Sequence, residues 1–106
     1  MREINYVYHL TPNMQDRLRV SAHIEGKIVV KFLVQYEAFI KQKWCPIVRY
    51  DTSHGFAHKD ILHPDGSVEK QPLLFYNFNL ALTFAIQDLK LLWKWYRSSY
   101  EQEKNL

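Results

Sequence analysis

Residues 28–40 carry an apolar side chain at every second position over thirteen residues, and this pattern constrains the fold more than any other in the chain. Every even position is apolar, while the odd positions include Lys31, Gln35 and Glu37. Successive side chains of a β-strand point to opposite faces, so the alternation predicts a strand with one face on a hydrophobic core. Residues 16–24 repeat the pattern. The two segments together predict the centre of an antiparallel sheet.

The register of this first hairpin is read from the polar stretch that separates the two strands. A three-residue turn, Glu25-Gly26-Lys27, pairs Val20 with Phe32 and Ile24 with Ile28. A two-residue turn would instead set Val20 opposite Lys31. The hydrophobic pattern therefore predicts the three-residue turn, in which the glycine supplies a positive φ.

The same reasoning applies at Lys41-Gln42-Lys43, where a three-residue turn leads into a third strand over about 44–51. The apolar pairs that follow are Ile40 with Trp44, Tyr36 with Val48 and Val34 with Tyr50. These pairs place Tyr50 in the core and leave the odd positions of this strand on the opposite face.

Three further strands are predicted outside this centre. Residues 56–63 form a fourth strand, and the turn signal of residues 64–66 (Pro-Asp-Gly) leads to a short fifth one near 68–74. This fifth strand is expected at an edge of the sheet, because Pro72 has no amide hydrogen to donate to a ladder. Residues 3–10 read as an additional N-terminal strand.

From Asn77 onward the apolar period changes to that of a long helix, and Asn77 itself is a suitable N-cap. One apolar stripe comprises Phe78, Leu82, Ala85, Leu89, Leu92 and Tyr96, and a second comprises Leu80, Phe84, Leu91 and Trp95. The first stripe can cover the sheet. The second needs another cover, for which we expect a homodimer or a protein partner, the alternative being the N-terminal segment.

These elements predict a single α+β domain over residues 1–106. An antiparallel, meander-like β-sheet of five to six strands occupies residues 1–75 and packs against one long C-terminal α-helix at 77–103. The composition agrees, because 47% hydrophobic and 15% aromatic residues can bury enough surface to offset the entropy lost on folding.

Charge and cysteine content exclude several classes of protein. A formal charge of +3 is far below that of a protein that coats DNA, but it permits an anionic partner such as RNA. The lone Cys45 excludes an internal disulfide and an all-cysteine zinc site, so we expect a buried thiol. The N-terminus lacks an apolar signal segment, and charged residues interrupt the stretch 80–96. We therefore expect a cytoplasmic protein that does not insert into a membrane.

Residues 49–66 concentrate the side chains that can carry chemistry. They include three of the five histidines, His54, His58 and His63, together with Arg49, Asp51, Lys59, Asp60 and Asp65. Histidine changes its charge near neutral pH, so a cluster of imidazole, carboxylate and guanidinium groups can move protons, hold a metal or bind phosphate.

The register of the hairpin that contains this segment decides which groups meet. A four-residue loop at 52–55 sets Asp51 opposite Phe56 and Arg49 opposite His58. The groups that would then share the face opposite the core are Arg49, Asp51, His58 and Asp60, beside Arg17, Arg19 and Lys31. A loop one residue longer or shorter would instead group Arg49 and Asp51 with Lys59 and His63.

The enzymatic interpretation of this face is RNA cleavage without a metal, which needs a base, an acid and a cation for the developing phosphorane charge. The candidate catalytic residues are Arg49, Asp51, His54, His58 and Asp60, and the candidate RNA-binding residues are Arg17, Arg19, Lys27 and Lys31. No cofactor is expected in this interpretation. A divalent metal at Asp51, His54, His58 and Asp60 is a second interpretation, and a hairpin of ordinary surface ion pairs is a third.

A run of residues in this region resembles the small bacterial and archaeal TumE-like proteins. It consists of Pro46-Ile47-Val48-Arg49-Tyr50-Asp51, His54-Gly55 and His58-Lys59-Asp60, followed by Pro64-Asp65-Gly66. TumE-like proteins are proposed toxins of toxin–antitoxin modules. The resemblance implies a growth-inhibiting toxin that acts on RNA, with a small DNA-binding antitoxin as its partner. The positions that it carries over are Arg49, Asp51, His54 and His58.

Overall fold

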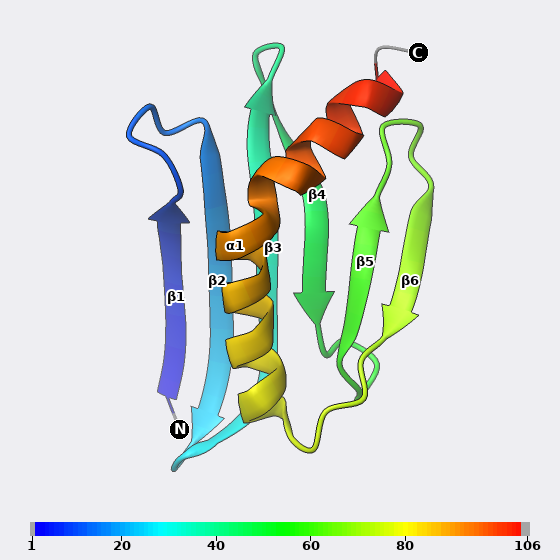
Figure 1. The fold of residues 1–106 in the computed structure, drawn as a ribbon. Coiled ribbons are helices and arrows are strands. Elements are labelled where there is room, and N and C mark those ends of the chain that lie inside the picture. Colours follow the sequence, from blue (N-terminus) through cyan, green and yellow to red (C-terminus); the bar gives the residue numbers. More distant parts are fainter. Residues whose placement is uncertain (1, 105–106) are drawn as a thin grey trace.

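A computed structural model describes residues 2–104 and confirms the α+β fold with a meander sheet. Six antiparallel strands lie side by side in chain order, and one long helix crosses one face of the sheet (Figure 1). The elements are β1 (Arg2–His9), β2 (Asp16–Glu25), β3 (Ile28–Ile40), β4 (Lys43–Asp51), β5 (His58–Leu62), β6 (Val68–Pro72) and α1 (Phe78–Lys104).

The hydrophobic core lies between the sheet and α1. The central strands contribute Leu18, Val34, Tyr36 and Tyr50, all fully buried, as the alternation predicts. The helix contributes three small or medium residues that are also fully buried, Ala81, Ala85 and Leu89. Each fully buried leucine or valine stabilises the fold by about 2 kcal/mol relative to an exposed one, so this layer holds the sheet and the helix together.

The start of α1 is fixed by asparagine side chains. The Asn77 side chain accepts a hydrogen bond from the Leu80 amide at 2.9 Å, so the predicted N-cap is confirmed. Asn79 bridges the helix to the β2–β3 hairpin, because its side chain accepts from the Val29 amide and donates to the Lys27 carbonyl. Within residues 2–104, no helix is both long enough and apolar enough to span a membrane.

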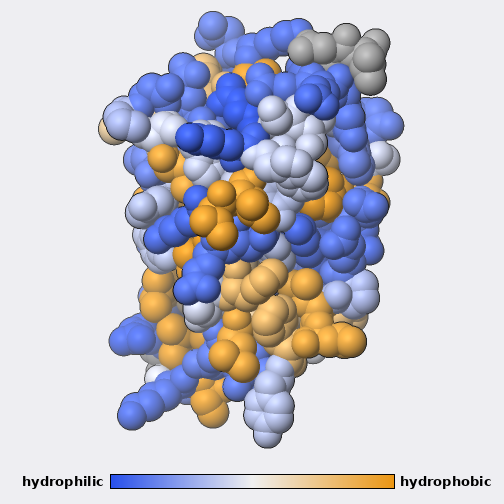
Figure 2. All heavy atoms as spheres, in the orientation of Figure 1, coloured by the Kyte–Doolittle hydropathy of each residue, from blue (hydrophilic) through white to orange (hydrophobic). Residues whose placement is uncertain are grey.

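The second apolar stripe of α1 lies on the surface, and the first stripe loses one predicted member. Leu91 is 82% exposed and Trp95 63% exposed, and Leu92 of the first stripe is also exposed. Figure 2, viewed from the helix side, shows apolar residues gathered over α1 and beside its lower part. The N-terminal segment does not cover this stripe, because β1 instead extends the sheet beside β2.

The predicted turn between β2 and β3 is wrong by one residue. The loop contains only Gly26 and Lys27, and Val20 lies opposite Val34 rather than Phe32. Val30 is an extra residue in β3, so this β-bulge reverses the alternation and leaves Ile28 exposed while Val29 is buried. The prediction failed because it assumed an unbroken ladder, which a bulge does not respect.

The predicted turn of the second hairpin is also wrong, and a β-bulge again accounts for the difference. Lys41 and Gln42 form a two-residue loop with φ of 52° and 68°, and Ile40 pairs with Lys43 instead of Trp44. Two successive positive φ values are typical of the type I′ turn, whose twist matches that of paired strands. Ile47 is then the extra residue of β4. Beyond it the predicted pairs are confirmed: these are Tyr36 with Val48 and Val34 with Tyr50.

Candidate functional site

The hairpin between β4 and β5 brings the predicted side chains to one face of the sheet. Its loop spans residues 52–57 rather than 52–55, so Asp51 pairs with His58 and Arg49 pairs with Asp60. The predicted register was wrong by two residues. Because side chains alternate with a period of two, this error keeps the same four residues together on the face opposite α1. That grouping is therefore confirmed.

The alternative register, which grouped Arg49 and Asp51 with Lys59 and His63, is wrong. The Lys59 ammonium lies on the helix side of the sheet, where it donates to the Tyr96 hydroxyl at 2.6 Å. The His63 imidazole contacts Glu103 near the end of α1 at 2.8 Å. Both side chains thus belong to the covered face.

Backbone and hydroxyl contacts shape the 52–57 loop. The buried Thr52 hydroxyl accepts a hydrogen bond from the Phe32 amide of β3 at 3.0 Å. The Gly55 amide donates to the Thr52 carbonyl, and Gly55 has a φ of 84°, which favours glycine. This tight turn carries His54 on its exposed side.

His58 is the centre of the candidate site. Its Nε2 lies 2.7 Å from Asp51 Oδ1 and 3.9 Å from Asp60 Oδ1, while its Nδ1 faces the Phe56 carbonyl oxygen at 3.4 Å. The residue is only 4% exposed. A carboxylate on one ring nitrogen holds the imidazole in a single orientation, as in other His–Asp pairs.

Two rings of the loop cover this imidazole. The His54 ring stacks on the His58 ring with centroids 5.8 Å apart and planes 29° apart. The Phe56 ring lies 5.6 Å from the same imidazole. His54 and Phe56 are both exposed, so the site presents one accessible imidazole above one buried imidazole.

Asp60 is buried beside His58 and has one charged partner from the edge strand. The Lys70 ammonium of β6 lies 3.5 Å from both Asp60 carboxylate oxygens. The Lys70 side chain is 61% exposed, whereas the Asp60 side chain is 5% exposed. Asp60 therefore adds negative charge to the base of the site and does not itself reach the surface.

Arg49 shares the face with His58, but its guanidinium contacts β3. Its Nε donates to Gln35 Oε1 at 2.8 Å, and the Gln35 amide donates in turn to Glu37 at 2.5 Å. Arg49 is partly exposed. Gln35 thus links the predicted phosphate-binding arginine to a carboxylate that the sequence interpretation did not use.

Glu37 also pairs with the two arginines that were predicted to bind an RNA backbone. Arg17 Nε donates to it at 2.7 Å and Arg19 Nε at 3.2 Å. Burial opposes its ionisation, but hydrogen bonds from Arg17, Arg19 and Gln35 outweigh this effect and lower the pKa of Glu37. Arg17 is further restrained by stacking 3.6 Å above the Trp44 ring. Part of the positive charge on this face is therefore compensated.

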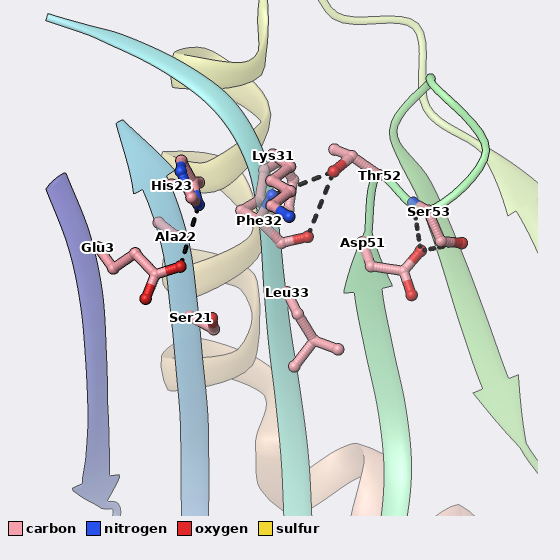
Figure 3. Close-up of a pocket in the computed structure, with 10 residues that line it drawn as sticks. All are labelled: Glu3, Ser21, Ala22, His23, Lys31, Phe32, Leu33, Asp51, Thr52 and Ser53. Carbon is pink, nitrogen blue, oxygen red and sulfur yellow. Dashed lines mark hydrogen bonds and ion pairs between the residues drawn. The ribbon is translucent and has the colours of Figure 1, made fainter. Parts of the chain in front are cut away.

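A pocket of about 460 Å³ opens beside Asp51 on the same face. Figure 3 shows Asp51 and Ser53 at one side of it and the Glu3–His23 pair at the other. The exposed Lys31, predicted to bind RNA, also lines this pocket, whereas Lys27 lies apart in the β2–β3 loop. The pocket gives a ligand room beside Asp51, and its lining combines the cation of Lys31 with the carboxylates of Glu3 and Asp51.

The metal interpretation has no geometric support. Among residues 2–104, no group of three or more His, Cys, Asp or Glu side chains is arranged to hold a metal ion. The proposed ligands Asp51 and Asp60 do flank His58, but His54 stacks on the His58 ring through its face. Cys45 is buried, as predicted.

A second polar cluster, on the covered face, was missed. Asp88 accepts hydrogen bonds from the hydroxyls of Tyr50 at 2.6 Å and Tyr96 at 2.7 Å, and Lys59 lies 3.9 Å away. Burial first, and then the hydrogen bonds to Asp88, raise the pKa of both tyrosines. The available signal was Asp88 itself, a carboxylate beside Leu89 on the sheet-facing side of the helix.

Comparisons with known proteins give one family and no characterised relative. Neither the search of curated proteins nor that of solved structures yields a match, and no finding links the chain to TumE-like proteins. The model of one family, described as a domain of unknown function (DUF7718), matches residues 1–106. This chain therefore belongs to the DUF7718 family.

Proposed function

We propose that the chain is a toxin-like protein that acts on RNA, as an endoribonuclease that needs no metal. One observation carries the proposal: the buried His58, held by Asp51 at 2.7 Å, lies directly beneath the exposed His54. Arg49 and a pocket that contains Lys31 adjoin this pair on the same open face. Imidazoles beside cations are the groups that metal-free phosphodiester cleavage requires.

In the proposed reaction the 2′-oxygen attacks the adjacent phosphorus. The O2′–P bond forms and the P–O5′ bond breaks, which leaves a 2′,3′-cyclic phosphate and a free 5′-hydroxyl. The exposed His54 takes the proton from the 2′-hydroxyl. His58 supplies the proton to the leaving O5′ once RNA draws the 52–57 loop away from its ring. Arg49 and Lys31 stabilise the phosphorane charge.

The RNA is proposed to cross the open face from the pocket toward the 52–57 loop. Arg19, with a side chain 48% exposed, and Lys31 provide accessible positive charge along that path. The exposed rings of His54 and Phe56 can stack on unpaired bases, which is how sheet surfaces commonly bind single-stranded RNA. A small DNA-binding antitoxin that blocks this face is the partner implied by the TumE-like resemblance.

The test compares two exposed histidines of the same face. Purified wild type, His54→Ala and His9→Ala are incubated with single-stranded RNA in EDTA, and cleavage is followed on denaturing gels. We expect wild type and His9→Ala to cleave equally, and His54→Ala to be slower by about 100-fold or more. The products should carry 2′,3′-cyclic phosphates. Induction in bacteria should stop growth for wild type and not for His54→Ala.

Three results would overturn the proposed metal-free cleavage at this site. Cleavage that survives His54→Ala would come from another site or from a contaminant. Cleavage that requires a divalent metal would return the metal interpretation. If fluorescence anisotropy shows RNA binding without cleavage, the proposed RNA-binding surface would stand and the proposed enzymatic activity would not.

A second candidate function is a non-catalytic interaction module that forms a homodimer through α1. The exposed stripe Leu80, Phe84, Leu91 and Trp95 favours it. The lysines beside the stripe face rings of the same chain, since Lys90 lies 4.1 Å above Tyr8 and Lys94 lies 5.7 Å from the Trp93 ring. This border therefore does not call for an acidic partner, and a second copy is the occupant we propose.

Analytical ultracentrifugation distinguishes this candidate. A dimer should dissociate in Leu91→Glu, because Leu91 is the most exposed member of the stripe and its loss leaves the core intact. Lys104→Glu, near the end of the same helix and outside the stripe, is the control. A wild type that stays monomeric at high concentration contradicts the dimer.

A further inference from the structure

A cavity lies on the covered side of the molecule, where the C-terminal half of α1 passes over the β5–β6 hairpin (Figure 1). Its volume is about 280 Å³. The walls are mainly apolar and aromatic, formed by Ile47, Ile61, Leu62, Trp95, Tyr96 and Tyr100. Such a volume lies below the usual range for drug-sized ligands, and it fits a single ring with a short substituent.

Lys59 is the amine of this cavity. Its side chain is 15% exposed, and its Nζ lies 4.8 Å from the Tyr96 ring centre and 5.5 Å from the Tyr50 ring centre. Burial lowers the pKa of Lys59, against the opposing effects of Asp88 and Glu69. A desolvated amine with a lowered pKa is the form of lysine that acts as a nucleophile.

A hydrogen-bond chain gives the ammonium proton a route away from this amine. Lys59 donates to the Tyr96 hydroxyl at 2.6 Å, and that hydroxyl donates to Asp88 at 2.7 Å. Tyr50 donates to the same Asp88 oxygen and fixes the carboxylate. A proton can therefore pass from Lys59 through Tyr96 to Asp88 and return, without a titratable group from solvent.

The charges around the cavity favour a neutral ligand. Glu69 and Glu103 line it in addition to Lys59, and Glu103 is bound to His63 at 2.8 Å. Two carboxylates in the lining repel an anionic ligand and favour a neutral group that an amine can bind. A carbonyl compound meets both requirements, because its carbon accepts the amine and its oxygen accepts a proton.

We propose that Lys59 captures a small aromatic aldehyde in this cavity as a Schiff base, with Tyr96 and Asp88 relaying the protons. This site lies on the face opposite the proposed ribonuclease site and does not depend on it. The aldehyde ring would lie against Trp95 and Tyr100, which would place its carbonyl group beside the Lys59 nitrogen.

The proposed reaction balances within these residues and water. The ammonium proton passes through Tyr96 to Asp88, and the amine lone pair attacks the carbonyl carbon to form the C–N bond. A proton moves from nitrogen to the alkoxide oxygen and gives a carbinolamine. The nitrogen lone pair then expels that oxygen as water, with the proton returned from Asp88 through Tyr96. The product is a protonated imine beside the restored Asp88 carboxylate.

The test uses benzaldehyde, a neutral single ring, as the probe, with sodium cyanoborohydride to reduce any imine to a stable amine. Peptide mass spectrometry then locates the adduct on the intact chain. We expect Lys59 to be modified at least about ten times faster than the exposed Lys70 of the adjacent strand. Lys70→Arg should leave this rate unchanged. Tyr96→Phe should lower the rate at Lys59 about ten-fold or more.

The pH profile separates a reactive amine from a structural lysine. The rate at Lys59 should reach half its maximum at lower pH than the rate at Lys70, since burial lowers the pKa of Lys59. Circular dichroism confirms that Tyr96→Phe is folded before it is compared. If it is unfolded, wild type alone decides the matter through the ratio of Lys59 to Lys70. Equal modification of the two lysines would overturn the proposal.

Discussion

The two faces of the sheet each hold a carboxylate, buried on one face and partly exposed on the other, and give it different partners. On the covered face Asp16 accepts from the Tyr36 hydroxyl at 2.6 Å and pairs with Arg97 of α1 at 2.8 Å. On the open face Asp51 pairs with His58 of the adjacent strand. The first contact joins the helix to the sheet, whereas the second stays within one hairpin.

For Asp16 and Asp51, this difference separates a contact that stabilises the fold from a contact that belongs to the candidate site. Groups that join distant elements hold the fold together, and their loss opens the helix–sheet layer. Residues within one hairpin are already joined by backbone hydrogen bonds. Their side-chain contacts therefore matter less for stability and can serve a ligand at the surface. The following predictions test this division, from the largest expected effect to the smallest.

Asp16→Ala should be the most destabilising change. It leaves the Tyr36 hydroxyl and part of the Arg97 guanidinium buried without their partner, which costs about 3 kcal/mol of unfolding free energy. Urea unfolding measures this cost. Glu101→Ala is the control, because it removes the second acidic partner of Arg97, which is 42% exposed, and should cost under about 0.5 kcal/mol. Equal costs would break the comparison.

Asp51→Asn should affect activity more than stability. The proposed RNA cleavage should slow by about 100-fold, because the amide no longer stabilises a charged His58. The unfolding free energy should fall by only about 1 kcal/mol, since the amide keeps a hydrogen-bonding oxygen. Asp65→Asn in the β5–β6 turn serves as the control in gel-based cleavage assays. A stability loss as large as that of Asp16→Ala would contradict the division between the faces.

A change outside both faces gives a baseline. Lys41→Asn combined with Gln42→Gly should raise the unfolding free energy by about 1 kcal/mol, because both loop positions have the positive φ that this pair tolerates best. Thermal and urea unfolding report the gain. RNA cleavage should be unchanged, and any loss of cleavage would show that the loop reaches the open face.

The smallest effect is a pH dependence at His63. The hydrogen bond to Glu103 raises the pKa of His63 above its ordinary value of 6.5. The contact therefore stabilises the fold fully below pH 6.5 and is lost as the pH rises through the folded-state pKa. Since both side chains are partly exposed, we expect less than about 0.5 kcal/mol. Urea unfolding of wild type and His63→Gln at several pH values isolates this contribution to the unfolding free energy, which should be absent in the variant.

The faces of the residues could be predicted from the sequence more securely than their partners. Alternation needs only parity, so the error of two residues in the 52–57 loop left Arg49 and His58 on the same face. The predicted lengths of the two hairpin loops were wrong because Val30 and Ile47 are extra residues in their strands. Nothing in an apolar β-branched residue marks it as a bulge, since it fits either face.

The contacts between the residues of the candidate site were harder to predict than which residues belong to it. Arg17 and Arg19 read as free cations because the sequence does not show that Glu37 lies between them. The stacking of His54 on His58 depends on the turn at Gly55, which a loop of unknown length does not specify. Asp88, by contrast, carried a usable signal, a carboxylate on the sheet-facing side of the helix.

The extra residue in β4 uncouples the length of this strand from the face that its side chains occupy. Trp44 and Pro46 lie before Ile47, and Arg49 and Asp51 lie after it, yet both groups pair with β3 residues of the open face. Both halves keep this face because Ile47 is left out of the ladder. Deleting Ile47 would restore strict alternation from Pro46 to Val48 and leave Arg49 and Asp51 on the open face. The deletion would therefore remove a buried side chain from the core and shorten the strand while the open face stays as it is.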